Sequence, residues 1–184
     1  MKRFIVMLLA ALMLLTLCAC GTASPAPAET AAPAPADVAE TAAPADAGMT
    51  PDYGPLAFEY QGQRFGILDE AEPLLAALGD AQDLFVAASC AYQGDDYIYY
   101  YDGIELTVNE IGGVLRVSGI AVVDDTLKTP QGVAIGMDVQ AALEAMDMDY
   151  VESDGVYTFS HGSAKLLLQA NGQGEIIAIR YLPA

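Results

Sequence analysis

The feature that most constrains the fold is a series of turn-forming segments that cuts the last two-thirds of the chain into short apolar runs. Gly is present in every one of these turns, at 94–96, 102–103, 112–113, 161–163 and 171–174, and Asp or Asn accompanies it in three of them. Short runs rich in Val, Ile, Leu and Tyr with such turns between them are typical of antiparallel hairpins. The expected strands are 56–60, 84–93, 97–101, 104–109, 114–123, 156–161, 164–170 and 175–182.

Two short stretches depart from the strand pattern, because their apolar residues recur at positions i, i+3, i+4 and i+7. This spacing places four side chains on one face of a helix. We expect Gly79 to end the first helix, and Asp69 and Asp138 to cap the two starts. The apolar positions are Ala71, Leu74, Leu75 and Leu78, and then Val139, Ala142, Leu143 and Met146.

The two helical stretches lie 68 positions apart, and Ile67 and Ile135 precede them at the same offset. Hairpins follow each stretch. We therefore predict an α+β domain at 53–184, made of a duplicated unit at about 56–124 and 129–184. Each unit would hold a leading strand, one short helix and antiparallel hairpins, with both helices on one face of an antiparallel sheet. Coincidence is the alternative, because apolar helix stripes are common.

The first 19 residues have the pattern of a secretory signal peptide. Lys2 and Arg3 precede an apolar run at 4–15 that is too short to span a membrane comfortably. The Leu-x-Ala-Cys motif that ends at Cys20 resembles the bacterial lipobox. The resemblance implies cleavage before Cys20, which becomes a lipidated first residue that anchors the chain without spanning the membrane. An ordinary signal peptide or an N-terminal anchor helix is the alternative.

Residues 20–52 continue with Ala, Pro, Thr and acidic residues, and only Val38 and Met49 are larger apolar residues. This composition cannot bury enough apolar surface to offset the entropy of ordering, so we expect a disordered tether. Its prolines favour extended segments, which gives a contour length of about 100 Å at most. We interpret the tether as a spacer without a binding role of its own.

The charge balance excludes several classes of partner. The chain has 7 Lys and Arg against 25 Asp and Glu, a net charge of −18. Cleavage before Cys20 removes two basic residues and no acid, which leaves 5 against 25 and a net charge of −20. Such a chain repels nucleic acid and anionic membrane surfaces. Cleavage also leaves Cys90 as the only free thiol, and we expect it to be a small buried core residue.

No pattern of catalytic residues stands out, so we do not expect an enzyme, a metal or a cofactor. The only histidine, His161, lies at the end of an expected strand, and no Gly-x-Ser-x-Gly motif is present. The acids at 147–154 superficially resemble a calcium loop but fail its spacing. A weak Ca²⁺ site among the turn pairs at 95–96 and 124–125 is left open as a hypothesis.

The most distinctive local feature is the run Tyr97-Ile98-Tyr99-Tyr100-Tyr101. In a strand, Tyr97, Tyr99 and Tyr101 share one face. Tyrosine offers a large contact area at low entropic cost, so this stripe is our candidate ligand-binding site, for sugars of the cell wall or for a protein partner. Ordinary cross-strand packing is the alternative.

Several segments after the tether together resemble a known group of proteins. They are Ser-Cys-Ala-Tyr-Gln-Gly at 89–94, the tyrosines at 97–101, Asp-Asp at 124–125, Thr-Pro-Gln-Gly-Val-Ala-Ile-Gly at 129–136 and Ile-Arg-Tyr at 179–181. In these the chain resembles uncharacterised lipoproteins of clostridia-like Firmicutes. More distantly, the helix followed by hairpins is similar to the repeats of β-lactamase-inhibitor protein and to small outer-membrane-assembly lipoproteins of Gram-negative bacteria. These distant likenesses imply a fold only.

The sequence therefore predicts a lipid-anchored, extracytoplasmic binding or interaction module without catalytic activity. Its partners would be the membrane, through Cys20, and an envelope protein or cell-wall glycan. A structural or assembly subunit of an envelope complex is the alternative. A carboxylate-dependent envelope enzyme is a third hypothesis, which would need a pocket holding an acid of raised pKa.

Overall fold

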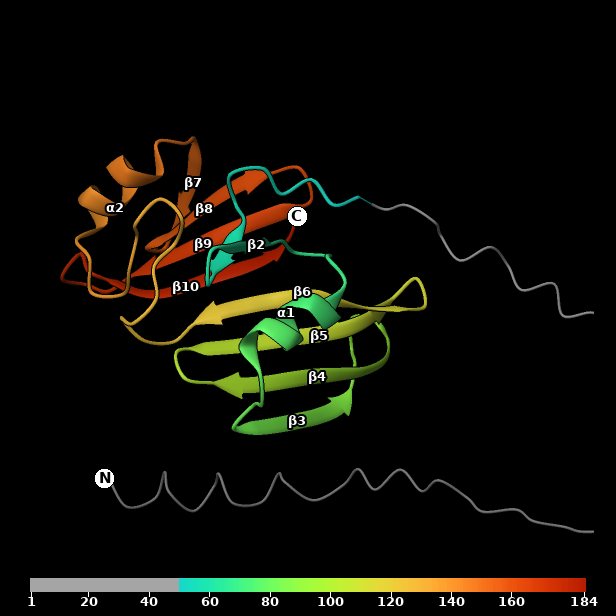
Figure 1. The fold of residues 1–184 in the computed structure, drawn as a ribbon. Coiled ribbons are helices and arrows are strands. Elements are labelled where there is room, and N and C mark those ends of the chain that lie inside the picture. The colour runs from blue at the N-terminus through green and yellow to red at the C-terminus, as the bar shows by residue number, and fades with distance from the viewer. Residues whose placement is uncertain (1–49) are drawn as a thin grey trace, which may run out of the picture. The chain divides into compact units, whose positions relative to one another are not determined.

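The computed structural model describes residues 50–184, so the expected signal peptide, Cys20 and most of the tether lie outside the described residues. The chain runs through two helices and ten strands in this part (Figure 1). In order these are β1 (Phe58–Tyr60), β2 (Gln63–Phe65), α1 (Ala71–Leu78), β3 (Asp83–Ala88), β4 (Gln93–Tyr101), β5 (Ile104–Ile111), β6 (Val114–Val122), α2 (Val139–Met146), β7 (Tyr150–Ser153), β8 (Val156–His161), β9 (Ala164–Ala170) and β10 (Ile176–Pro183).

Eight strands form one antiparallel sheet in the order β3-β4-β5-β6-β10-β9-β8-β7. The central pairing joins β6 to β10, with Ile120 opposite Tyr181 and Val122 opposite Ile179. β1 and β2 form a separate two-stranded sheet. The large sheet therefore has two edge strands, β3 and β7, which come from different parts of the sequence.

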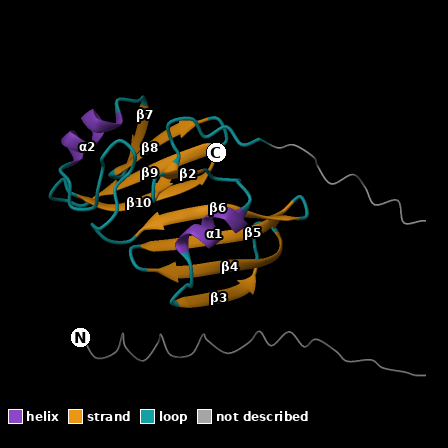
Figure 2. Ribbon diagram, viewed as in Figure 1, coloured by secondary structure: helices purple, strands orange, loops and turns teal. Residues whose placement is uncertain are grey.

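The predicted α+β class, with a duplicated unit of helix and hairpins, is wrong. The described domain is mostly β, because its two helices have only eight residues each whereas ten strands form its two sheets (Figure 2). A two-stranded sheet precedes α1, but residues 129–137 ahead of α2 contain no strand. The shared 68-residue offset located two helices correctly, yet helices of two turns are too short to define the architecture.

The helix ends show which capping predictions hold. Asp138 caps α2, since its carboxylate accepts the N–H groups of Gln140 at 2.9 Å and Ala141 at 3.2 Å. Glu70 is the N-cap residue of α1 and makes no side-chain capping bond. The prediction that Asp69 caps α1 is wrong, because its carboxylate accepts the Gly66 N–H instead. Gly79 ends α1 as expected.

The core lies between one face of the sheet and the two helices with β1 and β2. We call this the covered face, and the opposite one the open face. Alternate β5 residues Ile104, Leu106 and Val108 point into the core and are almost fully buried. Tyr181 on β10 is also buried, and its hydroxyl has no hydrogen-bond partner within residues 50–184.

The beginning and end of the described chain meet at the β8–β9 hairpin. The carbonyl oxygen of Asp52 accepts the N–H of Ser163 at 2.7 Å and its hydroxyl at 3.0 Å. The N–H of Ala184 donates to the carbonyl of Ser163 at 2.9 Å. Gly162 allows this approach, because a Cβ atom there would lie 2.1 Å from the Asp52 carbonyl oxygen.

None of the helices in residues 50–184 combines the length and the apolar character that a membrane crossing requires.

Candidate functional site

The three tyrosines predicted as a binding stripe lie on β4 and point to the covered face. Tyr97, Tyr99 and Tyr101 are half-buried and pack against the core. Their β5 neighbours across the ladder are the core residues Val108, Leu106 and Ile104. Most of the tyrosine surface is therefore engaged in packing.

At β3 the covered face ends in exposed apolar side chains. Tyr97 pairs with Val86 and Tyr99 pairs with Leu84, both on β3. Val86 is 45% exposed and Leu84 is 44% exposed. Figure 1 shows α1 over β5 and β6, in agreement with its contacts with β6, while β3 lies beyond the helix at the edge of the sheet. The helix thus leaves these two side chains uncovered.

The middle residue of the same strand is exposed on the opposite side. Phe85 points to the open face, where it pairs with Ile98 and is 53% exposed. Tyr100, two residues from Ile98, is also exposed on this face. Three consecutive large apolar side chains of β3 therefore contact solvent. We call Asp83–Ala88, with these three side chains, the β3 edge.

The hydrogen bonds around β3 indicate which main-chain groups face outward. Directly after the strand, the N–H of Ser89 donates to the carbonyl of Gly94 at 3.0 Å, in register with the β3–β4 pairing. Main-chain groups of an antiparallel strand alternate between the neighbouring strand and the free side. The outward-facing residues of the β3 edge are therefore Leu84, Val86 and Ala88.

A side-chain contact agrees with this assignment. The N–H of Leu84 donates to the Asp83 carboxylate at 2.8 Å, which is possible only because that N–H is not used by β4. Asp83 thus occupies the first outward donor of the edge. The N–H groups of Val86 and Ala88 have no comparable local acceptor among the described residues.

The charge around the β3 edge has one sign. Residues 70–115, which include α1 and β3 to β5, contain nine acids and no Lys or Arg. Hydrogen bonds from the side chains of Ser89 and Asn109 hold the pKa of Asp96 below its usual range, so this carboxylate stays charged. The acids are Glu70, Glu72, Asp80, Asp83, Asp95, Asp96, Asp102, Glu105 and Glu110.

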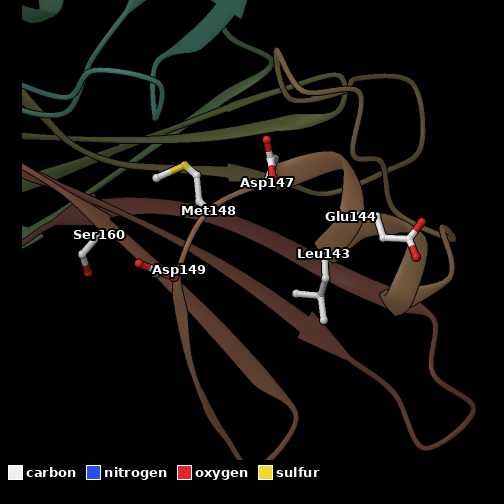
Figure 3. A pocket seen from close by; sticks show the side chains of 6 residues that line it. All are labelled: Leu143, Glu144, Asp147, Met148, Asp149 and Ser160. Carbon is white, nitrogen blue, oxygen red and sulfur yellow. The ribbon is translucent and has the colours of Figure 1, made fainter.

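A second candidate is an acidic hollow between α2 and the β7–β8 hairpin, with a volume of about 580 Å³. Its carboxylates point in different directions instead of converging on one point (Figure 3). Among residues 50–184, no group of three or more His, Cys, Asp or Glu side chains is placed to hold a metal ion. The hollow is lined by Leu143, Glu144, Asp147, Met148, Asp149 and Ser160.

The turn acids considered for Ca²⁺ are engaged in local hydrogen bonds. The Asp124 carboxylate accepts the N–H of Thr126 at 2.9 Å and its hydroxyl at 2.5 Å, and these bonds lower the pKa of Asp124. Asp96 accepts a bond from the side chain of Asn109. The Asp124 carboxylate thus stabilises its own turn, whereas Asp96 lies within β4 and bonds across to Asn109 on β5.

Cys90 and His161, the thiol and the imidazole of the described residues, lie at different hairpins of the sheet. His161 ends β8, as predicted, with its Nε2 atom 3.4 Å from the Asp52 carboxylate. The prediction of a buried Cys90 is wrong: the residue is exposed in the turn between β3 and β4. The strand ends at Ala88, because the hydroxyl of Ser89 accepts the N–H of Tyr92 at 3.0 Å and forms a turn.

Comparisons with known proteins assign no role to any of these residues. No protein-family model and no curated protein matches the sequence. One similar solved structure is a cysteine-rich secretory protein from Staphylococcus aureus, with 9% identity and a TM-score of 0.43 over 63% of this chain. Another is an extracellular protein containing an SCP domain from Bacillus anthracis, with 15% identity and a TM-score of 0.38 over 63%. The chain spans 44% and 43% of the lengths of these two proteins.

Proposed function

We propose that this protein is a lipid-anchored, extracytoplasmic interaction module without catalytic activity, and that it contacts its partner through the β3 edge. The observation that carries the proposal is the exposure of Leu84, Phe85 and Val86 on an edge strand. Sheet edges in soluble proteins are usually shortened, charged or covered, because they otherwise pair with other chains. An edge left apolar is typical of a surface that another protein covers.

The absence of catalysis is part of the proposal and has its own support. Hydrolysis by a nucleophile needs a base within hydrogen-bonding reach. Cys90 lies in the β3–β4 turn, whereas His161 lies at the β8–β9 hairpin near Asp52. The carboxylates of the hollow beside α2 also diverge. These described residues offer no assembled set of nucleophile, base and oxyanion donors.

The lipid anchor rests on the Leu-x-Ala-Cys motif that ends at Cys20. A test is to grow bacteria that make the full-length chain with a labelled fatty acid, alongside the variant Cys20→Ala. We expect label and membrane fractionation for the unchanged chain and the loss of both in the variant. A chain that is secreted without label in both forms would contradict the anchor and leave the β3 proposal to be judged separately.

Site-specific photo-crosslinking tests the interaction surface directly. A photoreactive phenylalanine analogue replaces Phe85 in the full-length chain within intact bacterial envelopes, and Val123 serves as a matched control. Both positions are similarly exposed, at 53% and 55%, but Val123 lies just after β6, away from the β3 edge. We expect a discrete protein adduct from position 85 and none from position 123.

The crosslinking result tests whether β3 is an interaction site. Identical adduct patterns from both positions, or none from position 85, would contradict an interaction site on β3. Co-purification of the partner with the uncrosslinked chain in an intact envelope complex would favour the role of a structural subunit over that of a transient binding module.

A further inference from the structure

We infer that the β3 edge binds an extended, positively charged segment of another protein, which adds to the sheet as a ninth strand. This inference rests on the proposed function and specifies the chemistry of its partner. It combines the outward main-chain groups, the apolar side chains and the acidic surroundings of Asp83–Ala88.

The main chain of β3 provides the pairing sites. Val86 and Ala88 present an N–H and a carbonyl away from β4, in positions where an added strand would form ladder hydrogen bonds. The Leu84 N–H is occupied by the Asp83 carboxylate. A Lys or Arg of the partner that binds this carboxylate would release the Leu84 N–H for a third main-chain bond. The main-chain groups at the centre of the β3 edge are thus available for pairing. At its start, the Leu84 N–H is blocked by the Asp83 carboxylate, which a cation can draw away.

The side chains of β3 specify a partner strand that offers β-branched or apolar side chains on both faces. On the covered face, an added strand would lie beside Leu84 and Val86, which are backed by the half-buried Tyr99 and Tyr97. On the open face it would lie beside Phe85. Side chains on both faces of the partner would therefore meet apolar surface, and cross-strand pairs with aromatic and β-branched residues are the most stabilising.

The acidic residues at both ends of β3 indicate that the partner segment is positively charged. Asp80 and Asp83 lie at its beginning, and Asp95 pairs with Ala88 at its end. The strand spans about 17 Å between these ends. Basic residues on both sides of a short apolar core would match this spacing. The surrounding segment at 70–115 contains no base that could compensate its nine acids internally.

Two other occupants fit this chemistry less well. A second copy would place one acidic β3 region against another, with like charges facing across the new pair. Residues 21–49 of the same chain contain four acids, no base and prolines at 25, 27, 33, 35 and 44. Proline cannot donate to a ladder, so this segment is a poor ninth strand.

Synthetic peptides test the inference on the full-length chain in detergent. The first alternates Val and Thr over five residues between two terminal pairs of Lys. The second replaces every Lys with Glu. The third keeps the Lys but methylates the main-chain nitrogens along one edge. We expect the first to bind, as measured by fluorescence anisotropy, and the other two to bind at least about tenfold more weakly. Binding of the first should also weaken at high salt.

The variant Val86→Pro tests the position on the protein. Proline removes an outward N–H that β4 does not use, so the β3–β4 ladder should persist. We expect loss of binding of the first peptide with an unchanged circular dichroism spectrum, whereas Val86→Thr, which keeps the N–H, should retain most of the affinity. If Val86→Pro unfolds the domain, the methylated peptide still tests main-chain pairing on the unaltered protein.

The outcomes distinguish this inference from the proposed function. Equal binding of the Lys and Glu peptides, or of the methylated one, would overturn the cationic ninth strand. So would a dimer in solution that Val86→Pro dissociates, because a second copy would then be the occupant. If no peptide binds but the adduct at position 85 persists, the inference fails and the proposed function stands. If the adduct is absent as well, both fail.

Discussion

The two edges of the large sheet, β3 and β7, have the same position in the topology but differ in length, charge and side-chain packing. β7 has only four residues, and Glu152 places a charge among them. The exposed ring of Tyr150 packs edge-on against Tyr157, with ring centroids 5.6 Å apart, and at a tilt against Phe159, with ring centroids 5.7 Å apart. β3 is longer, and no charge interrupts its apolar residues from Leu84 to Ala88.

The difference shows how one sheet can be protected at one edge and available at the other. Shortness and a charge on the strand are among the common ways to prevent edge-to-edge pairing, and β7 has both. On β3 the only comparable device is Asp83, at the start of the strand. On β7, Tyr150 is therefore partly held by intramolecular aromatic contacts while Val151 is 71% exposed, whereas on β3 three consecutive large apolar residues are exposed.

The largest expected effect comes from removing the support of β7. Phe159 on β8 is fully buried and lies opposite Tyr150. We expect Phe159→Ala to reduce the free energy of unfolding by about 3–5 kcal/mol, because a cavity remains and the Tyr150 contact is lost. Urea denaturation followed by circular dichroism measures this. A loss below about 1 kcal/mol would show that β7 does not depend on this contact.

A matched pair of edge variants makes the comparison sharper. Tyr150 and Phe85 are similarly exposed, at 46% and 53%. We expect Tyr150→Ala to cost about 1 kcal/mol of unfolding free energy through its lost aromatic contacts. Phe85→Ala should cost at most about 0.5 kcal/mol, in the range of surface substitutions. Equal costs in the same denaturation assay would mean that Phe85 is a packing residue, which would weaken its assignment to an interaction surface.

The two helices should also differ in how much their N-terminal residues contribute to stability. Asp138 caps α2 with two hydrogen bonds, whereas Glu70 makes no capping bond at α1. We expect Asp138→Ala to lower the unfolding free energy by about 1 kcal/mol, and Glu70→Ala to have an effect near zero. Thermal denaturation of both variants checks this, and a larger loss for Glu70→Ala would contradict it.

The smallest expected effect is a pH dependence of the stability of the domain, caused by Asp69, which precedes α1. Burial raises the pKa of Asp69, although the Gly66 N–H, the Tyr53 hydroxyl and Arg116 partly oppose it. Folding therefore favours the protonated carboxyl. That contribution to stability is present below the ordinary carboxyl pKa and is lost as the pH rises through the raised value.

The variant Asp69→Asn should remove this titration. The melting temperature of the unchanged chain should fall relative to that of the variant as the pH increases from about 3 to 6. A difference between the two melting temperatures that is independent of pH would show that Asp69 does not carry the effect.

The elements were predictable where a local signal determines them. Helical spacing located α1 and α2, and the Gly and Asp turns located most of the hairpins. β2 and β7 were missed because runs of three and four residues with several polar members carry too little alternation. The α+β class failed because a pattern of local elements does not reveal how many strands join into one sheet.

The candidate site was predicted in part. The tyrosine stripe was placed on the correct strand, but its partial burial comes from packing against a core whose residues are spread over the whole domain. The exposed trio on β3 was missed, because an unbroken apolar run usually indicates a strand covered on both faces. Only the strand order shows that β3 is at an edge. Cys90 was misplaced for a similar reason, since the Ser89 turn ends the strand early.

The clamp between Asp52 and Ser163 determines how a mechanical load would pass through the domain. The chain enters at the β8–β9 hairpin, and five strand pairings separate β9 from β3. At the usual spacing between strands this is about 24 Å. Tension between the residues that precede Asp52 and a ligand on β3 would therefore cross most of the sheet. The ladders between β9 and β3 would carry this load in parallel with the covalent segment 53–82, which joins the same two points through β1, β2 and α1.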